Sequence, residues 1–241
     1  MWRGFDIDIK IKENEVFERL KKVGQSIYNT DLQQVQFSLN TFINGDNSLD
    51  GTAIRNYWFP QVDTDVFISH SHKDVDTALV LCGWLWETFE IRAFIDSSIW
   101  GYSNDLQRAI DNKHCFIPTR NVYSYELRNH STSHVHMILS TALNMMIDKS
   151  ECLFFLNTPN SIRAYDKTDK TESPWIYSEI ATSQIIQKTE PVRRVTESFS
   201  NFEGESQIKK GVTITHNVDL NHLTKLDFDK IIKWGNSKRE K

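Results

Sequence analysis

The sequence predicts an α/β protein whose parallel sheet is covered by helices on both faces, and three short apolar runs carry this prediction. The runs are residues 65–69, 91–95 and 152–156. Each run has the composition of a strand buried on both faces, and a polar loop and then a helical segment follow it. Strands and helices that alternate in this order are typical of a parallel sheet with helices on either side.

The remaining elements follow from the spacing of apolar residues and from turn signals. Residues 1–60 are predicted to form a helical N-terminal extension, because 16–23 and 32–43 have apolar residues at helical spacing and 45–48 is a turn cluster. The main α/β domain is then 61–241, with a helical insertion at about 112–150. After the first strand, a helix is expected to bury Leu79, Cys82, Trp86 and Phe89. A last helix is expected at 221–234.

The composition excludes several classes of protein. The chain has 241 residues, 39% of them hydrophobic, which suffices for a large core. A formal charge of -4 argues against a nucleic-acid binder that works by general electrostatic attraction. No run of 18 apolar residues and no apolar signal core appear, so no membrane partner is expected. Three isolated cysteines without CxxC spacing indicate reduced thiols and a cytoplasmic protein.

A helix start near residue 173 carries the clearest chemical signal. Ser173 is a good N-cap and Pro174 suits the first helical position. Trp175 and Glu179 then lie one turn apart on one face of that helix. A carboxylate beside an aromatic ring can hold a ribose and stack on a base, although a packed tryptophan and a solvated glutamate are the ordinary alternative.

Other polar and aromatic residues are expected near the same edge of the sheet. In parallel α/β sheets, ligands bind outside the carboxyl ends of the strands, where the loops after residues 69, 95 and 156 should meet. The tip of the first strand carries Phe67, Ser69, His70 and Ser71, and of these Phe67 is expected in the core rather than in the site. Asp96 follows the second strand and binds a ribose or caps a turn. Trp100 lies in the next loop, with binding and packing equally plausible.

Metal and serine-hydrolase chemistry are not favoured. The pairs His70/His72 and His134/His136 have i, i+2 spacing, which suits a metal on a strand, yet the second pair falls in a predicted helix where that spacing diverges. No cysteine or carboxylate cluster completes a ligand set, so no metal site is expected. The G-x-S-x-G elbow and the common phosphate-binding glycine motifs are absent from the sequence.

Three short motifs in this order resemble the Toll/interleukin-1 receptor (TIR) domain family. Residues 65–69 (Asp-Val-Phe-Ile-Ser) resemble its first strand, residues 94–96 (Phe-Ile-Asp) the end of its second strand, and Trp175-x-x-x-Glu179 the helix motif of its NAD-consuming members. The resemblance spans about 65–188 and implies a flavodoxin-like doubly wound sheet. The segment at about 112–150 is longer than usual in the family. The loop after Asp96 lacks the Arg-Asp-x-x-Pro pattern of receptor members, which favours the bacterial enzyme branch.

The resemblance implies an enzyme that cleaves the nicotinamide–ribose bond of NAD+, as a glycohydrolase or an ADP-ribosyl cyclase. It implies Glu179 as the catalytic residue and NAD+ as substrate, without a cofactor. The substrate-binding residues would be Phe67, Ser69, His70, Ser71, Asp96, Trp100 and Trp175. Self-association through TIR contacts, an effector that senses the product, and a role in anti-phage defence such as Thoeris are also implied. Two alternatives stay open: a non-catalytic TIR scaffold, and a nucleoside ribosyl-transferring enzyme.

Overall fold

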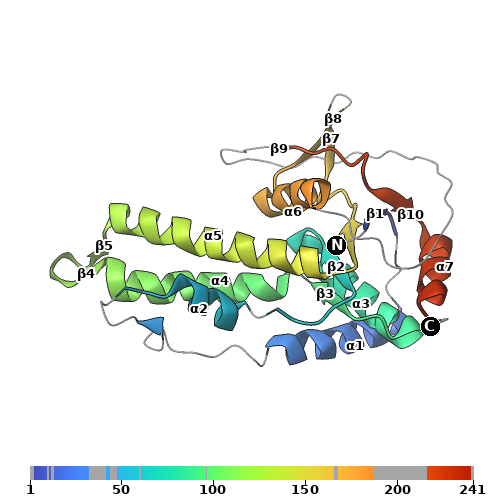
Figure 1. Ribbon diagram of the computed structural model, residues 1–241, viewed down its shortest axis with the longest axis horizontal. Helices are drawn as coiled ribbons and strands as arrows, with labels where there is room; N and C mark the ends of the chain where they lie inside the picture. The colour runs from blue at the N-terminus through green and yellow to red at the C-terminus, as the bar shows by residue number, and fades with distance from the viewer. Residues whose placement is uncertain are drawn as a thin grey trace.

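A five-stranded, all-parallel sheet organises the chain in the computed structural model, which describes residues 3–9, 11, 14–32, 42–43, 48–59, 61–95, 97–165, 168–186 and 216–239. The strands lie in the order β10, β1, β6, β2, β3, and helices cover both faces (Figure 1). Their bounds are Thr224–Leu226 (β10), Arg3–Ile7 (β1), Cys152–Leu156 (β6), Val66–Ser69 (β2) and Ala93–Ile95 (β3). This is a flavodoxin-like α/β fold, as the sequence predicts.

The three strands expected from apolar runs are confirmed. Strand β6 has the predicted bounds, and β2 and β3 begin one and two residues after theirs. Strand β2 lies between β3 and β6 and pairs with both in parallel register. Their carboxyl ends, and the polar loops that follow them, therefore lie along one edge of the sheet.

The N-terminal segment differs from the expected helical extension, because Arg3–Ile7 forms β1 inside the main sheet. This strand pairs in parallel with β6 on one side and with β10 on the other. Phe5 and Ile7 face one side of the sheet and are buried, so the alternation typical of a strand was present in the sequence. The domain boundary at residue 60 therefore does not separate the first residues from the sheet.

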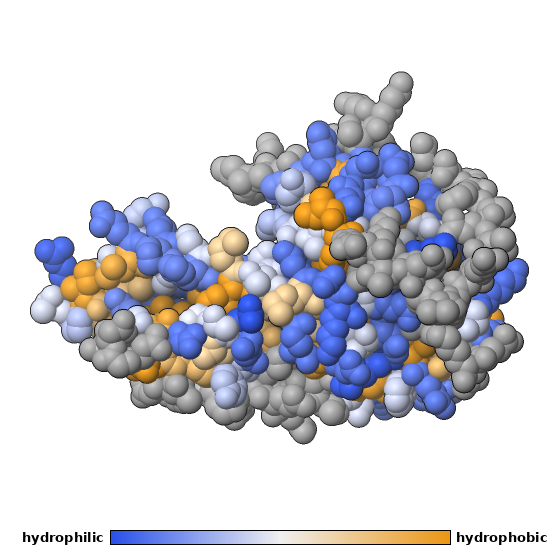
Figure 2. Space-filling view, viewed as in Figure 1, coloured by the Kyte–Doolittle hydropathy of each residue, from blue (hydrophilic) through white to orange (hydrophobic). Residues whose placement is uncertain are grey.

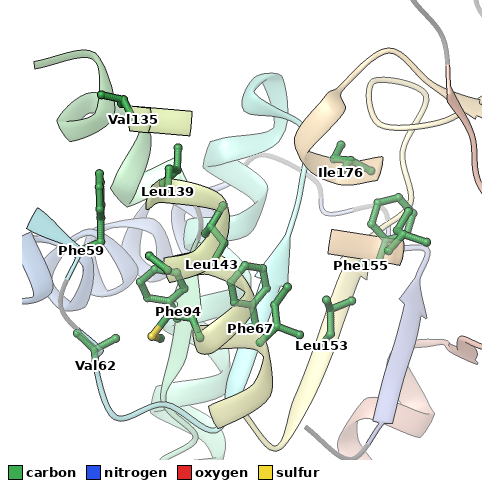
Figure 3. Close-up of a cluster of buried hydrophobic side chains, with 14 of the residues drawn as sticks. Phe59, Val62, Phe67, Phe94, Val135, Leu139, Leu143, Leu153, Phe155 and Ile176 are labelled. Atoms are coloured by element: carbon green, nitrogen blue, oxygen red, sulfur yellow. The ribbon is translucent and has the colours of Figure 1, made fainter. Parts of the chain in front are cut away.

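Two hydrophobic clusters pack against the two faces of the sheet. On one face, Phe5, Ile68 and Phe154 pack under α3 (Val75–Phe89) and α7 (Phe228–Arg239), and α1 (Glu15–Leu32) covers α3. On the other face, Phe67 and Phe155 lie under α5 (Tyr125–Lys149) and α6 (Pro174–Ile185), as Figure 3 shows. Alternate residues of one strand therefore serve opposite cores, which explains the continuous apolar runs.

The predicted insertion at about 112–150 forms most of an elongated arm. Helix α4 (Ser97–Ile110) and α5 lie side by side and extend away from the sheet, with α2 (Gly51–Trp58) beside them (Figure 1). A short antiparallel hairpin, β4 (Phe116–Ile117) and β5 (Val122–Tyr123), forms the tip. Helix α5 begins at Tyr125, where the Ser124 hydroxyl accepts a hydrogen bond from Leu127 N.

A buried carboxylate ties the two long helices of the arm together. Asp111 accepts hydrogen bonds from Ser131 Oγ at 2.8 Å, Gln107 Nε2 at 2.8 Å and Arg128 Nε at 2.9 Å. Burial alone would raise the pKa of Asp111, but these hydrogen bonds outweigh it and hold that pKa below its ordinary value. The arm is thus anchored at residue 131, in the first half of α5.

The C-terminal part also differs from one expectation. The helix predicted at 221–234 begins only at Phe228, because residues 224–226 form β10 and pair with β1. A second, antiparallel sheet stands beside α6 and consists of β7 (Arg163–Tyr165), β8 (Thr168–Thr171) and β9 (His216–Asn217). None of the described helices is long and apolar enough to cross a membrane.

Candidate active site

Helix α6 begins as its capping signals predict. The Ser173 hydroxyl accepts a hydrogen bond from Ile176 N at 3.3 Å, and Pro174 occupies the first helical position. Trp175 and Glu179 therefore lie one turn apart near the start of this helix. The helix packs over the carboxyl end of β2, on the face of the sheet that also carries Phe67 and Phe155.

Glu179 is buried and hydrogen-bonded to the end of β2. Its side chain is only 1% exposed, so the solvated-glutamate alternative does not apply in this structure. Ser69, the last residue of β2, donates a hydrogen bond of 2.6 Å from Oγ to Glu179 Oε2. The contact joins residues 110 positions apart and brings together two of the predicted site residues. A short hydrogen bond to a carboxylate in a low-dielectric interior is strong and fixes the orientation of both groups.

A second buried carboxylate, Asp6, lies on the same face of the sheet two strands away, and sequence reasoning missed it. Asp6 pairs in register with Phe155, which pairs in register with Ser69, so these three residues form one layer across β1, β6 and β2. Asp6 is 5% exposed, and its Oδ2 accepts a hydrogen bond from Asn157 Nδ2 at 3.3 Å. Burial raises the pKa of Asp6 above its ordinary value. The alternation of Phe5, Asp6 and Ile7 was the available signal.

The loop after β2 is less open than the sequence suggests. His70 is 3% exposed, and its Nδ1 lies 3.4 Å from the carbonyl oxygen of Ile68, so the ring is turned into the protein. Ser71 is half-buried, and its hydroxyl accepts a hydrogen bond from Lys73 N, which caps the short 3₁₀ helix His72–Asp74. His70 therefore lies at the expected edge of the sheet but is not open to solvent.

A second polar contact joins the loops after β2 and β6. Asp74 accepts a hydrogen bond from Thr158 Oγ1 at 2.6 Å and another from Asn160 Nδ2 at 2.7 Å. Ser161 Oγ donates to the carbonyl oxygen of Leu156 at 2.8 Å and so closes the turn after β6. The sequence showed both polar loops, but it contained no signal that their side chains would contact one another.

Trp175 links α6 to the arm. It is half-buried against the hydrophobic cluster, and its ring meets His136 of α5 edge to face, with centroids 5.8 Å apart and an interplanar angle of 82°. Figure 2 shows that the surface is hollowed between the arm and the lobe that carries α6. The contact between Trp175 and His136 therefore joins α6 to α5 of the arm. Packing and ligand stacking both remain compatible with this position.

The other predicted site residues are placed as follows. Phe67 is fully buried and packs on Phe94, with ring centroids 5.6 Å apart, so it lies in the core beneath the site. Asp96 lies outside the described residues. For Trp100 the structure describes the backbone, within α4, and not the side chain.

Within the described ranges, no group of three or more histidine, cysteine, aspartate or glutamate residues is placed to hold a metal ion. The three cysteines are free and buried. What the site offers is one buried carboxylate held by a hydroxyl, with a second buried carboxylate in the same layer of the sheet.

No protein-family model matches this chain, and no curated protein and no solved structure matches it. The class of this protein is defined by its fold and by the geometry of the site. It is an α/β protein with a flavodoxin-like parallel sheet and a buried glutamate at the carboxyl edge of that sheet.

The burial of Asp6 leads to a prediction about stability and pH. Because the pKa of Asp6 is raised in the folded protein, the folded state keeps the proton to a higher pH than the unfolded state does. The protein therefore loses stability as the pH rises from 3.8, the ordinary pKa, through the raised pKa of the folded state. Asp6→Asn, which can still accept from Asn157, should therefore be more stable than the wild type at pH 7, with the gain vanishing near pH 3.5.

Urea unfolding at both pH values measures this difference. The matched control is Asp63→Asn, since the Asp63 side chain is 93% exposed and its surface ion pair with Lys149 contributes little to stability. An Asp6→Asn protein that is less stable than the wild type at pH 7 would show that ionised Asp6 has a favourable partner.

Proposed function

We propose that this chain is a TIR-domain enzyme that cleaves the nicotinamide–ribose bond of NAD+. The observation that carries the proposal is the buried hydrogen bond between Ser69 and Glu179. It joins the end of the D-V-F-I-S strand to the W-x-x-x-E helix, the two motifs on which the resemblance depends. A glutamate on a surface helix is ordinarily exposed to solvent. Glu179 is instead 1% exposed, and its side chain accepts a hydrogen bond from the last residue of β2.

The chemistry requires little more than such a carboxylate. Nicotinamide in NAD+ is a cationic pyridinium, so it leaves without protonation by a general acid, and one of the two carboxylates of an ordinary glycosidase is dispensable. The developing positive charge on the ribose is stabilised by a nearby negative charge, and this attraction is stronger where water is excluded. In the proposal Glu179 supplies that charge, and Ser69 is a positioning residue that orients it.

The substrate must reach a carboxylate that is covered in this structure. We infer that NAD+ enters through the hollow between the arm and α6, where the contact between Trp175 and His136 would open. A site that closes again around the ribose would exclude water after nicotinamide leaves. Such closure favours cyclisation of the ADP-ribosyl group over its hydrolysis, and either product could serve as a signal for an effector in anti-phage defence in the cytoplasm.

The alternatives are less well supported by this geometry. A TIR scaffold that acts only by self-association predicts a solvent-facing Glu179, whereas the side chain is buried. A nucleoside ribosyl-transferring enzyme would also use a buried glutamate. Its substrate distinguishes it from the proposed enzyme, because it would act on free nucleosides and not on NAD+.

The test of the proposal is release of nicotinamide from NAD+ over a wide range of protein concentrations, with the second product identified by mass. We expect release that rises more than linearly with protein concentration if self-association completes the site. A product lighter than ADP-ribose by one water would identify the cyclase. Absence of both turnover and saturable NAD+ binding would contradict the proposal.

Replacing Ser69 with alanine tests the role of the hydroxyl. The variant removes the hydrogen bond to Glu179 Oε2, so we expect kcat to fall roughly 10- to 100-fold while KM changes little, because the lost interaction orients the catalytic group rather than the substrate. Steady-state kinetics measure this split, and Ser133→Ala on the exposed side of α5 is the control. An unchanged kcat would show that Ser69 has no positioning role.

A further inference from the structure

Two exposed histidines stand one turn apart on the arm, away from the candidate active site. His130 and His134 have i, i+4 spacing on α5, and both side chains are exposed. Their rings lie side by side, with centroids 4.6 Å apart and an interplanar angle of 57°. The pair differs from His134 and His136, whose spacing places them on different faces of the helix and whose second member contacts Trp175.

The separation of the two rings matches what one metal ion requires. A metal 2.0–2.1 Å from a ring nitrogen lies about 3.2 Å from the ring centroid, so two imidazoles bound at a cis angle of about 90° have centroids about 4.5 Å apart. The observed 4.6 Å is close to this value. The helix therefore already holds the two rings at the separation that a shared metal ion requires.

The helix holds this pair rigidly and adds a favourable charge. The adjacent face of the helix is anchored by Ser131, which donates to Asp111, and by buried Val135. Glu126 lies one further turn toward the start of α5, exposed, and its carboxylate adds negative charge on the same stripe of the helix. In the part of the chain that the structure describes, neither ring has a hydrogen-bond or ion-pair partner to lose on binding a metal.

We propose that His130 and His134 form a two-histidine site for a divalent transition-metal ion. Two cis imidazole nitrogens with water at the other positions suit the tetragonal geometry of Cu²⁺, and the general order of metal affinities also places Cu²⁺ above Ni²⁺ and Zn²⁺. Zn²⁺, which usually takes three or four protein ligands, should bind more weakly. The site is independent of the proposed NAD+ chemistry, so a failure of one does not affect the other.

The test is titration of the full chain, prepared without a histidine tag, with Cu²⁺ in a non-coordinating buffer. Calorimetry gives the stoichiometry and affinity, and electron paramagnetic resonance counts the bound nitrogens. We expect one tight site with two equatorial imidazoles, and His130→Ala or His134→Ala should each weaken it at least about tenfold. His114→Ala, an exposed histidine nearer the tip, should leave it unchanged.

Two results would overturn the proposal. One is a Cu²⁺ affinity that stays the same in both His130→Ala and His134→Ala, and the other is a spectrum with a single equatorial imidazole in the wild type. Because both substitutions lie on an exposed helix face, we expect the variants to fold, and a thermal melt without metal checks that they do.

Discussion

Replacing Glu179 with glutamine is expected to lower kcat for nicotinamide release from NAD+ by at least about 10³-fold, or about 4 kcal/mol of transition-state stabilisation. The glutamine has the same shape, and its carbonyl oxygen can still accept the hydrogen bond from Ser69. The change therefore removes the negative charge and little else. Since the charge on the ribose develops only in the transition state, kcat should fall much more than KM rises.

The control for this prediction is Glu18→Gln, a charge-neutralising change of the same kind at an exposed position of α1. It should retain wild-type kinetics. Thermal unfolding of both variants shows whether the loss of activity comes from a loss of the folded structure. If the Glu179→Gln protein released nicotinamide at the wild-type rate, the residue would have a structural role only, and the proposed mechanism would be wrong.

The largest effect on stability is expected where α1 crosses α3. Gly83 of α3 faces the backbone of α1 so closely that a Cβ atom there would lie 2.1 Å from the carbonyl oxygen of Leu20. Gly24 of α1 has the reciprocal contact, at 2.0 Å from the carbonyl oxygen of Leu79. Both obstacles are backbone atoms, so the two helices must move apart to admit even a methyl group.

Gly83→Ala is therefore expected to lower the free energy of unfolding by about 3 kcal/mol or more, through overpacking of the helix contact. The intrinsic helix propensity of alanine alone would predict a gain of about 1 kcal/mol, so the sign of the result separates the two effects. Urea unfolding followed by tryptophan fluorescence measures it. Gly51→Ala, whose Cβ would meet its nearest neighbour at an ordinary 3.7 Å, should be neutral or slightly stabilising.

Local patterns in the sequence were sufficient for several elements of the fold. The runs at 65–69, 91–95 and 152–156 predicted β2, β3 and β6 because strands buried on both faces need unbroken apolar sequence. Ser173 and Pro174 predicted the start of α6, since capping depends on residues within one turn. In α3, the expected core residues Leu79, Cys82 and Phe89 are buried, but Trp86, also expected in the core, is 43% exposed.

In the candidate site, local sequence patterns likewise identified individual residues but not the contacts between them. The sequence identified Glu179, Ser69 and Trp175 as residues of interest, but it did not show that Ser69 and Glu179 form a hydrogen bond. Asp6 was missed because the N-terminal segment was interpreted as part of a helical extension. No local pattern shows which strand will fill the place between β6 and β10.

The sequence by itself determined the α/β class, the strands built from uninterrupted apolar runs, and the helix that presents Trp175 and Glu179 one turn apart. These depend on interactions within a few residues, or on the apolar content of a single segment. Only the tertiary structure decided that residues 3–7 complete the sheet, that His70 is turned inward, and that Glu179 is buried against Ser69. Strand pairing and burial depend on residues far apart in the chain, and their energies are settled only when the whole core is assembled.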